Sequence, residues 1–146
     1  METQGHEDTK ILLGDVGEHP ALPPETERLA STIVDSAFRV HSTIGPGLME
    51  SVYEVCLCHE LNKRQVAFKR QVAFPITYDG LRLDGGLRID LLVSELVIVE
   101  LKAVEIMHPV FEAQLLSYLK LTGLRLGLLI NFNVRLIKDG IKRIIV

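Results

Sequence analysis

Three charged residues interrupt two apolar segments of the chain. Asp90 lies in the segment 87–93, and Glu100 and Lys102 lie in the segment 96–103. Carboxylate oxygens are the ligands that a hard divalent cation such as Mg²⁺ prefers, and a nearby ammonium can stabilise an attacking water and the charge that develops on a phosphate. A carboxylate in an apolar strand is costly unless it is compensated. We therefore expect a metal ion to bind between Asp90 and Glu100.

The same residues have a simpler interpretation. Glu100 and Lys102 could form an ion pair on a solvated sheet face, with Asp90 as a third surface charge, because charges that alternate with apolar residues usually lie on such a face. Both segments are nearly apolar apart from these positions, however, and functional groups tend to break local patterning. The metal site is the favoured interpretation.

The register between the two segments decides whether these side chains meet. Glu100 and the lysine two residues later share one face of a strand, because side chains alternate. A two-residue hairpin loop would place Asp90 on the opposite face. A three-residue loop over 94–96 pairs Val93 with Val97 instead, and Asp90 then lies opposite Glu100. We predict the three-residue loop, or a bulge with the same effect.

Two helical segments carry further candidates. Gln114 and Tyr118 are four residues apart and share one helix face, from which an amide and a phenol could reach a phosphate or the lysine. Tyr118 could equally belong to the edge of an amphipathic core. Glu50 could be a third metal ligand, although an acid near a helix N-terminus is also explained by the helix dipole.

The elements that must position these residues follow from periodicity and breaker residues. They are helices from about Glu25 to Ile44 and from Met49 to Asn62, a strand region 66–78 that Pro75 confines to an edge or bulge, a hairpin of 87–93 and 96–103, a helix 109–122, a buried strand 126–130 and a last hairpin over 134–146. A strand, a helix and a buried strand in succession imply a right-handed crossover. The predicted fold class is α/β, with a mixed central sheet flanked by helices in the order ααβββαββ.

Charge is distributed unevenly along the 146 residues, of which 47% are apolar. Residues 1–28 carry seven acids and two bases, whereas the remainder carries 14 basic and 12 acidic residues. We expect a flexible acidic tail over 1–23 and one folded domain over 24–146. The domain lacks the strong basic character of a tight nucleic-acid binder, so binding to nucleic acid would be weak or assisted by a partner.

Composition also bears on location. No apolar run approaches the ~20 residues of a membrane span, and the acidic N-terminus does not resemble a signal peptide. Cys56 and Cys58 are two apart in a helical pattern and suit reduced, buried thiols better than a metal site, because no second ligand pair exists. We expect a cytoplasmic protein without a membrane partner.

With these residues assembled, the chain resembles the GxxExxY family of the PD-(D/E)XK nuclease-like superfamily. The motif that names the family reads Gly47-Leu48-Met49-Glu50-Ser51-Val52-Tyr53. The superfamily core reads Asp90, nine residues, then Glu100-Leu101-Lys102. The segment 114–118 resembles the Q-x-x-x-Y motif of exonuclease-like branches. The resemblance extends from about Leu29 to Val146.

The resemblance implies a restriction-endonuclease-like core and a role for each matching residue. Asp90, Glu100 and the Leu101 carbonyl would hold Mg²⁺ or Mn²⁺, with Glu50 near the metal. Lys102 would position the attacking water, and Gln114 and Tyr118 would orient the lysine or the phosphate. One position departs from the pattern: Phe111 stands where the resemblance leads us to expect a histidine.

These observations favour a metal-dependent nuclease that hydrolyses phosphodiester bonds in DNA or RNA. The alternative is a catalytically inert module that binds nucleic acid or protein on a nuclease-like fold, which the small size and near-neutral charge favour. A purely structural protein would leave the three charged interruptions unexplained. A homodimer or a protein partner is expected to help a chain of this size span its substrate.

Overall fold

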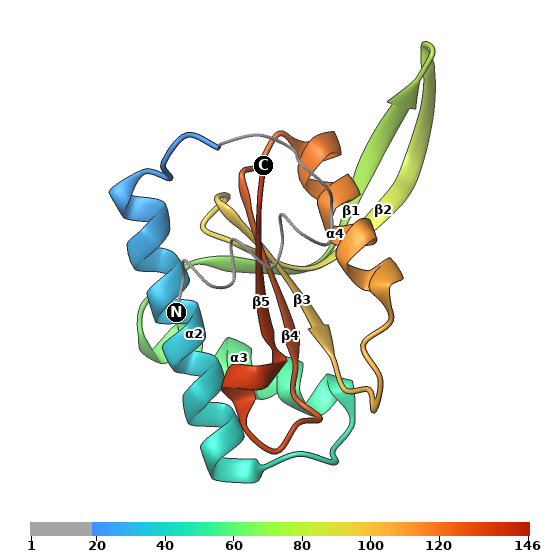
Figure 1. Cartoon of the computed structure of the whole chain (residues 1–146). Helices are drawn as coiled ribbons and strands as arrows, with labels where there is room; N and C mark the ends of the chain where they lie inside the picture. Colours follow the sequence, from blue (N-terminus) through green and yellow to red (C-terminus); the bar gives the residue numbers. More distant parts are fainter. Residues whose placement is uncertain (1–18) are drawn as a thin grey trace.

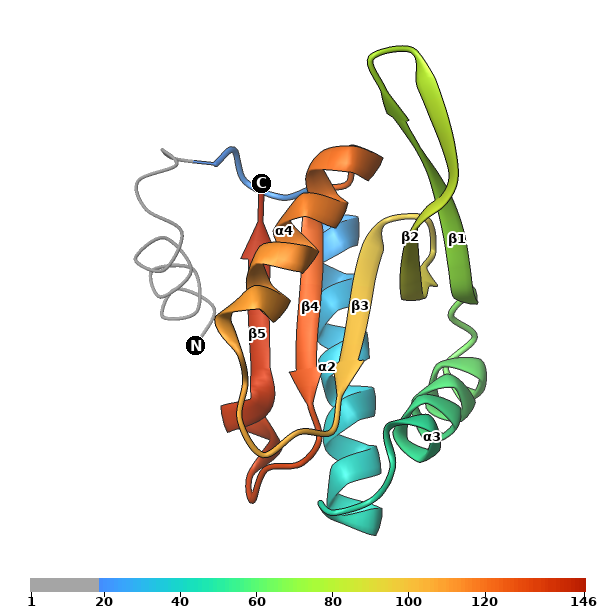
Figure 2. The ribbon, with the colours of Figure 1, turned by 90° about the vertical axis from the view of Figure 1, so that its right-hand side faces the viewer.

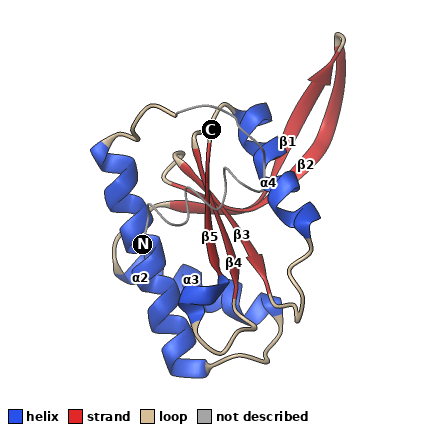
Figure 3. Ribbon diagram, viewed as in Figure 1, coloured by secondary structure: helices blue, strands red, loops and turns tan. Residues whose placement is uncertain are grey.

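A five-stranded mixed sheet lies at the centre of the computed structural model, which describes residues 19–146 (Figures 1 and 3). The strands follow one another across the sheet in chain order, and α2 and α3 cover one face while α4 covers the other (Figure 2). The elements are α2 (Pro24–Ile44), α3 (Glu50–Lys63), β1 (Phe68–Tyr78), β2 (Leu81–Val93), β3 (Val97–Lys102), α4 (Pro109–Thr122), β4 (Leu126–Asn131), η1 (Ile137–Gly140) and β5 (Ile141–Ile145). The predicted α/β class and mixed sheet are confirmed, and the predicted order is matched roughly, with η1 as an additional element before β5.

The helices begin and end where local chemistry requires. Pro24 opens α2, where its missing N–H costs nothing, and Gly45 ends the helix with a φ of 71°. The His108 side chain caps α4 by accepting a hydrogen bond from the Val110 N–H at 3.1 Å. Gly123 ends α4 in the left-handed conformation, at φ 77° and ψ 5°.

The crossover predicted between the two central strands is present. β3 and β4 are parallel and are joined through α4, whereas the other neighbouring strands are antiparallel. All six residues of β4 are buried, because helices cover both faces of the sheet at this strand. The sheet is therefore mixed, as expected.

The loop between β2 and β3 has the predicted length. It spans residues 94–96 and pairs Val93 with Val97. Ser94 and Glu95 take positive φ values of 51° and 58° to close it. The register that sets Asp90 toward Glu100 is thereby confirmed.

β1 and β2 form a ribbon that projects beyond the rest of the sheet (Figures 1 and 2). Its turn, Asp79-Gly80, has two positive φ values, 49° and 78°, which suit a tight hairpin. The pairing register shifts between Phe74 and Ile76, around the edge-strand proline that the sequence placed at a bulge. β2 begins at Leu81, six residues before the expected start at 87, because the ribbon continues past the covered sheet.

The last hairpin predicted over 134–146 is wrong. Residues 137–140 form η1, and β5 pairs antiparallel with β4. The reason is the open edge of β4, whose backbone groups need a partner along the full strand. Gly140 brings the turn against that strand: a Cβ added there would lie 2.1 Å from the Asn131 carbonyl oxygen.

The described residues that precede α2 pack on the domain. Leu22 is buried in the core between the sheet and α2. The Arg125 guanidinium donates to the carbonyl oxygens of Pro20 and Ala21. Residues 1–18 of the expected tail lie outside the described part of the chain.

Within the part described, no helix is long and apolar enough to cross a membrane.

Candidate functional site

β2 and β3 separate at Asp90 and Glu100. The last backbone pair between the strands is Leu91 with Val99, and beyond it side chains replace the ladder. The Asp90 N–H donates to Glu100 Oε2 at 3.0 Å, and the Leu101 N–H donates to Asp90 Oδ2 at 2.9 Å. The two predicted acids are thus held across the gap between two strands by reciprocal hydrogen bonds.

The separation coincides with a change of face in β2. Leu87 and Ile89 pack in the core beneath α4, whereas Leu91 and Val93 pack in the core beneath α2 and α3. Alternation would keep all four on one face. The strand therefore switches faces at Asp90, which frees the carboxyl from a regular strand position.

β1 switches faces at the same level. Phe68 packs toward α2 and α3, and Val72 packs toward α4. Gln71, between them, has a φ of 50° and lies at the register position opposite Asp90. The irregularity at the candidate site therefore extends through both strands of the ribbon.

Burial dominates the electrostatics of Glu100, which is only 6% exposed. Desolvation is the largest cause that raises the pKa of Glu100, and together with the neighbouring Asp90 carboxyl it brings the pKa to about 9, against the opposing influence of Lys102. A divalent cation between the carboxyls would relieve both unfavourable effects. The donor set therefore fits a hard divalent cation such as Mg²⁺ or Mn²⁺.

Glu50 begins α3 on the other side of the sheet, yet it responds to the same charges. Partial desolvation and the Asp90 carboxylate raise the pKa of Glu50, and Lys102 lowers it. The side chain is largely exposed and is the first residue of its helix. The structure thus brings Glu50 within electrostatic reach of the pair.

The loop before α3 is fastened by Tyr53. Its hydroxyl donates to the Gly45 carbonyl oxygen at 2.7 Å and accepts from the Leu48 N–H at 3.1 Å. Its fully buried ring stacks on Phe132, with centroids 4.6 Å apart and planes 9° apart. Gly47 supplies a φ of 92° within this loop. The glycine and tyrosine of the motif therefore hold the helix start that carries Glu50.

Lys102 lies on the α4 side of β3. Its Nζ is 4.4 Å from the centroid of the Phe111 ring, and its carbonyl oxygen accepts from the Phe132 N–H at 2.9 Å. It has the same strand parity as Glu100, as predicted. The ammonium therefore faces an aromatic ring at the start of α4.

Gln114 and Tyr118 bond to each other on α4. Gln114 Nε2 donates to the Tyr118 hydroxyl at 2.9 Å. Burial, followed by the Glu100 carboxyl, raises the pKa of Tyr118. The helix thus presents an amide and a phenol beside Glu100, with the amide engaged by the phenol.

The acids near the site do not form a ready three-ligand cluster. Within residues 19–146, no three side chains of His, Cys, Asp and Glu are placed to hold a metal ion together. Asp90 and Glu100 are a pair, and the Leu101 peptide lies beside them through its N–H. A metal ion here would take its remaining oxygens from the backbone, water or substrate.

A polar network that sequence reasoning missed supports Gln71. The buried Glu54 carboxylate accepts from Arg70 at 2.9 Å and from the Gln71 amide at 2.7 Å. The Arg88 guanidinium donates to Gln71 Oε1 at 2.9 Å. The only signal in the sequence was Glu54 itself, four residues after Glu50.

A cavity of about 340 Å³ opens beside this network. It is lined by Met49, Glu50, Ser51, Glu54 and Gln71. The cavity therefore adjoins Glu50 and Gln71, and neither Asp90 nor Glu100 lines it.

Asn131 was also missed. It is buried at the end of β4, in register with Lys102, and its Oδ1 accepts from the Val104 and Asn133 N–H groups, each at 3.1 Å. Its Nδ2 donates to the Val104 carbonyl oxygen at 2.9 Å. A single polar residue that ends an apolar run was the available signal. Asn131 holds the chain where it leaves β3, directly after the lysine.

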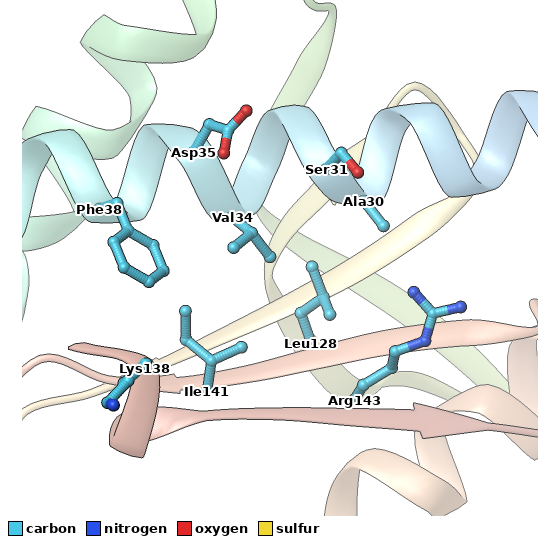
Figure 4. A pocket seen from close by; sticks show the side chains of 9 residues that line it. All are labelled: Ala30, Ser31, Val34, Asp35, Phe38, Leu128, Lys138, Ile141 and Arg143. Atoms are coloured by element: carbon cyan, nitrogen blue, oxygen red, sulfur yellow. The ribbon is translucent and has the colours of Figure 1, made fainter. Parts of the chain in front are cut away.

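Another hollow, of about 230 Å³, lies between α2 and the β4–β5 edge (Figure 4). Val34 and Phe38 of α2 face Leu128 and Ile141 of the sheet across it. None of the predicted site residues lines it, so it is separate from the carboxyl pair.

The two cysteines are free thiols. Burial raises the pKa of Cys58 to about 11, which keeps it protonated and unreactive at neutral pH. This agrees with the expected role of small apolar core residues.

Comparison with protein families identifies a relationship. The sequence model of the PD-(D/E)XK nuclease superfamily matches residues 27–144, a range that contains every predicted site residue. No curated protein and no solved structure matches the chain.

Proposed function

The chain belongs to the PD-(D/E)XK nuclease superfamily, and on that premise we propose that it is a metal-dependent nuclease that hydrolyses phosphodiester bonds in DNA or RNA. The observation that carries the proposal is the crossed pair Asp90 and Glu100 at the point where β2 and β3 separate. Two carboxyls in contact, one of them buried, are unfavourable without a cation. A cation bound between the two carboxyls would remove this repulsion, and the free energy gained would contribute to the affinity for the ion.

The side chains have distinct roles in this proposal. Asp90, Glu100 and the Leu101 carbonyl would hold Mg²⁺ or Mn²⁺, with Glu50 near the metal. A bound ion supplies Lewis acidity that activates water and stabilises the charge on the reacting phosphate.

Lys102 acts on the same phosphate. Its ammonium positions the attacking water and stabilises a non-bridging oxygen as negative charge grows there. On α4, Tyr118 is close enough to Glu100 to respond to its charge, and Gln114 donates a hydrogen bond to Tyr118. We therefore assign this amide and this phenol to orienting the phosphate. Glu50 approaches from the α3 side and completes the set.

We also assign the chain to the GxxExxY family within the superfamily. The support is the structural coherence of the motif: Gly47 shapes the loop, Tyr53 fastens it, and Glu50 starts the helix toward the acids. In this assignment the motif serves to bring a third acid to the site.

The nucleic acid is bound weakly, or with the help of a second copy or a partner protein, because the domain carries little excess positive charge. The free thiols suit a reducing compartment, and we place the activity in the cytoplasm.

Two observations favour a second candidate, an inert module that binds nucleic acid or protein. Both carboxyls already accept backbone hydrogen bonds, and no three-ligand cluster exists among the described residues. In that case metal would not bind at millimolar concentration and nucleic acid would not be cleaved.

Calorimetric titration with Mn²⁺ and Mg²⁺ separates the two candidates. We expect stoichiometric binding to the wild type and to Lys102→Ala, and no binding to Asp90→Ala. A screen of single- and double-stranded DNA and RNA should then show cleavage by the wild type alone. Absence of both binding and cleavage in the wild type would establish the inert module, whereas cleavage by Lys102→Ala at the wild-type rate would remove the lysine from the mechanism.

A further inference from the structure

The contact between Lys102 and Phe111 joins β3 to the first turn of α4. The Nζ atom lies 4.4 Å from the ring centroid, within the ~6 Å range of a cation–π interaction. Among the ion pairs of the described residues, none involves Lys102. The aromatic ring is therefore the group that the ammonium contacts most directly.

We propose that Phe111 is a positioning residue for Lys102, and that its ring holds the ammonium on the α4 side of the sheet beside Glu100. The inference rests on the proposed nuclease function for its catalytic purpose, although the contact itself does not. It also accounts for an aromatic residue where the family resemblance predicted a histidine.

A lysine needs such support because its side chain is long and flexible. Four methylene groups leave the ammonium many rotamers, and restricting them costs conformational entropy. A phenyl ring attracts the ammonium through its negative face and carries no charge at any pH. A protonated imidazole at the same place would repel it.

The ring is itself held in place. The His108 imidazole meets Phe111 edge to face, with centroids 6.4 Å apart and planes at 65°. The same imidazole caps α4 through the Val110 N–H, and the Phe111 N–H donates to the His108 carbonyl oxygen at 3.0 Å. The helix cap therefore fixes the ring from the α4 side.

The lysine backbone is fixed from the opposite side. Its carbonyl oxygen accepts from the Phe132 N–H, and Asn131 clamps the chain just beyond it through Val104. With both backbones held, the ring face determines where the flexible side chain rests.

Three variants test the inference. Phe111→Leu keeps an apolar side chain and removes the ring face, whereas Phe111→Tyr retains the face. Phe74→Leu is the matched control, because Phe74 packs against the same core as Phe111. We expect Phe111→Leu to lower kcat by about 3- to 30-fold with little change in KM, and the other two to remain near the wild type.

An NMR measurement tests the contact without requiring activity. With labelled lysine, and the Lys102 signal assigned by its loss in Lys102→Arg, the ring current of Phe111 should shift the ε-methylene protons upfield. The shift should persist in Phe111→Tyr and Phe74→Leu and disappear in Phe111→Leu.

The outcomes are distinct. An unshifted Lys102 signal in the wild type would overturn the contact. A shifted signal with unchanged kcat in Phe111→Leu, or an equal loss of kcat in Phe74→Leu, would overturn the positioning role. If the wild type cleaves nothing, the proposed function fails and takes this catalytic purpose with it, while the NMR shift still reports the contact.

Discussion

Glu100 is the residue at which burial and proton binding coincide with the proposed metal binding. Its carboxyl is almost inaccessible, and burial together with Asp90 raises its pKa to about 9 from an ordinary value of 4.5. In the metal-free protein it therefore carries a proton at neutral pH. The proton and the metal ion compensate the same buried charge, so they must compete for it.

The first prediction concerns stability without metal. Because the folded state binds the Glu100 proton more tightly than the unfolded state does, this contribution is complete below about pH 4.5 and is lost as the pH rises through about 9. The glutamine side chain in Glu100→Gln does not ionise, so the variant lacks this pH-dependent loss of stability. At pH 8.5 the variant should be more stable than the wild type by on the order of 1–3 kcal/mol, and the difference should shrink toward pH 5.

Urea unfolding in EDTA at several pH values measures this difference. Asp35→Asn, an exposed acid on α2, serves as the control and should show no comparable trend. A difference in unfolding free energy between the wild type and Glu100→Gln that is the same at pH 5 and pH 8.5 would show that Glu100 is already ionised without metal.

A second prediction follows for metal binding. The ion must displace the proton of Glu100, so Mn²⁺ affinity should rise between pH 6 and pH 8.5 and about one proton should be released on binding near neutral pH. Calorimetry in buffers of different ionisation enthalpy counts that proton. In Glu100→Gln any residual binding should release none, and equal release from both proteins would assign the proton to another group.

At the scale of elements, the turn that brings β5 onto β4 depends on a missing side chain. Gly140 approaches the Asn131 backbone too closely for a Cβ, and Asn131 in turn clamps the exit of β3. The turn before β5 and the end of β3 after Lys102 are therefore coupled through Asn131.

The third prediction tests this close approach. Gly140→Ala should lower the free energy of unfolding by about 2 kcal/mol or more, because the contact is with backbone and cannot be relieved by a rotamer change. Asp139→Ala, exposed in the same turn, should have little effect. Denaturant unfolding of the two variants and the wild type measures these differences. A Gly140→Ala variant as stable as Asp139→Ala would show that the turn can shift without cost.

At the scale of the whole molecule, the residues before α2 pack against the segment that begins β4. Leu22 enters the core, and Arg125, just before β4, holds the carbonyls of Pro20 and Ala21. The folded unit thus includes residues that composition assigned to the acidic tail.

The fourth prediction compares two shortened chains, one starting at His19 and the other at Pro23. The shorter chain loses the buried Leu22 side chain and two of the three acceptors of Arg125, the carbonyl oxygens of Pro20 and Ala21. It should be less stable by about 2 kcal/mol, with a Tm lower by roughly 5 °C. Scanning calorimetry measures both, and Leu22→Ala in the full chain should reproduce most of the loss. Identical melting curves would place the boundary at α2.

Much of the site could be predicted from sequence because its determinants are local. Strand alternation placed Glu100 and Lys102 on one face, and the same alternation required the three-residue loop that sets Asp90 toward Glu100. Helix ends followed from Pro24, Gly45 and Gly123, whose backbone preferences do not depend on distant residues.

Long-range contacts decided the rest. Alternation within β2 could not reveal the change of face at Asp90, because that change depends on Gln71 in the paired strand and on its bonds to Glu54 and Arg88. The partner of β5 was set by the open edge of β4. The sequence by itself determined which charged residues interrupt the apolar strands and are candidates for the chemistry. Only the tertiary structure decided how deeply Glu100 is buried and that a phenyl ring lies over Lys102, because both depend on contacts between elements distant in the chain.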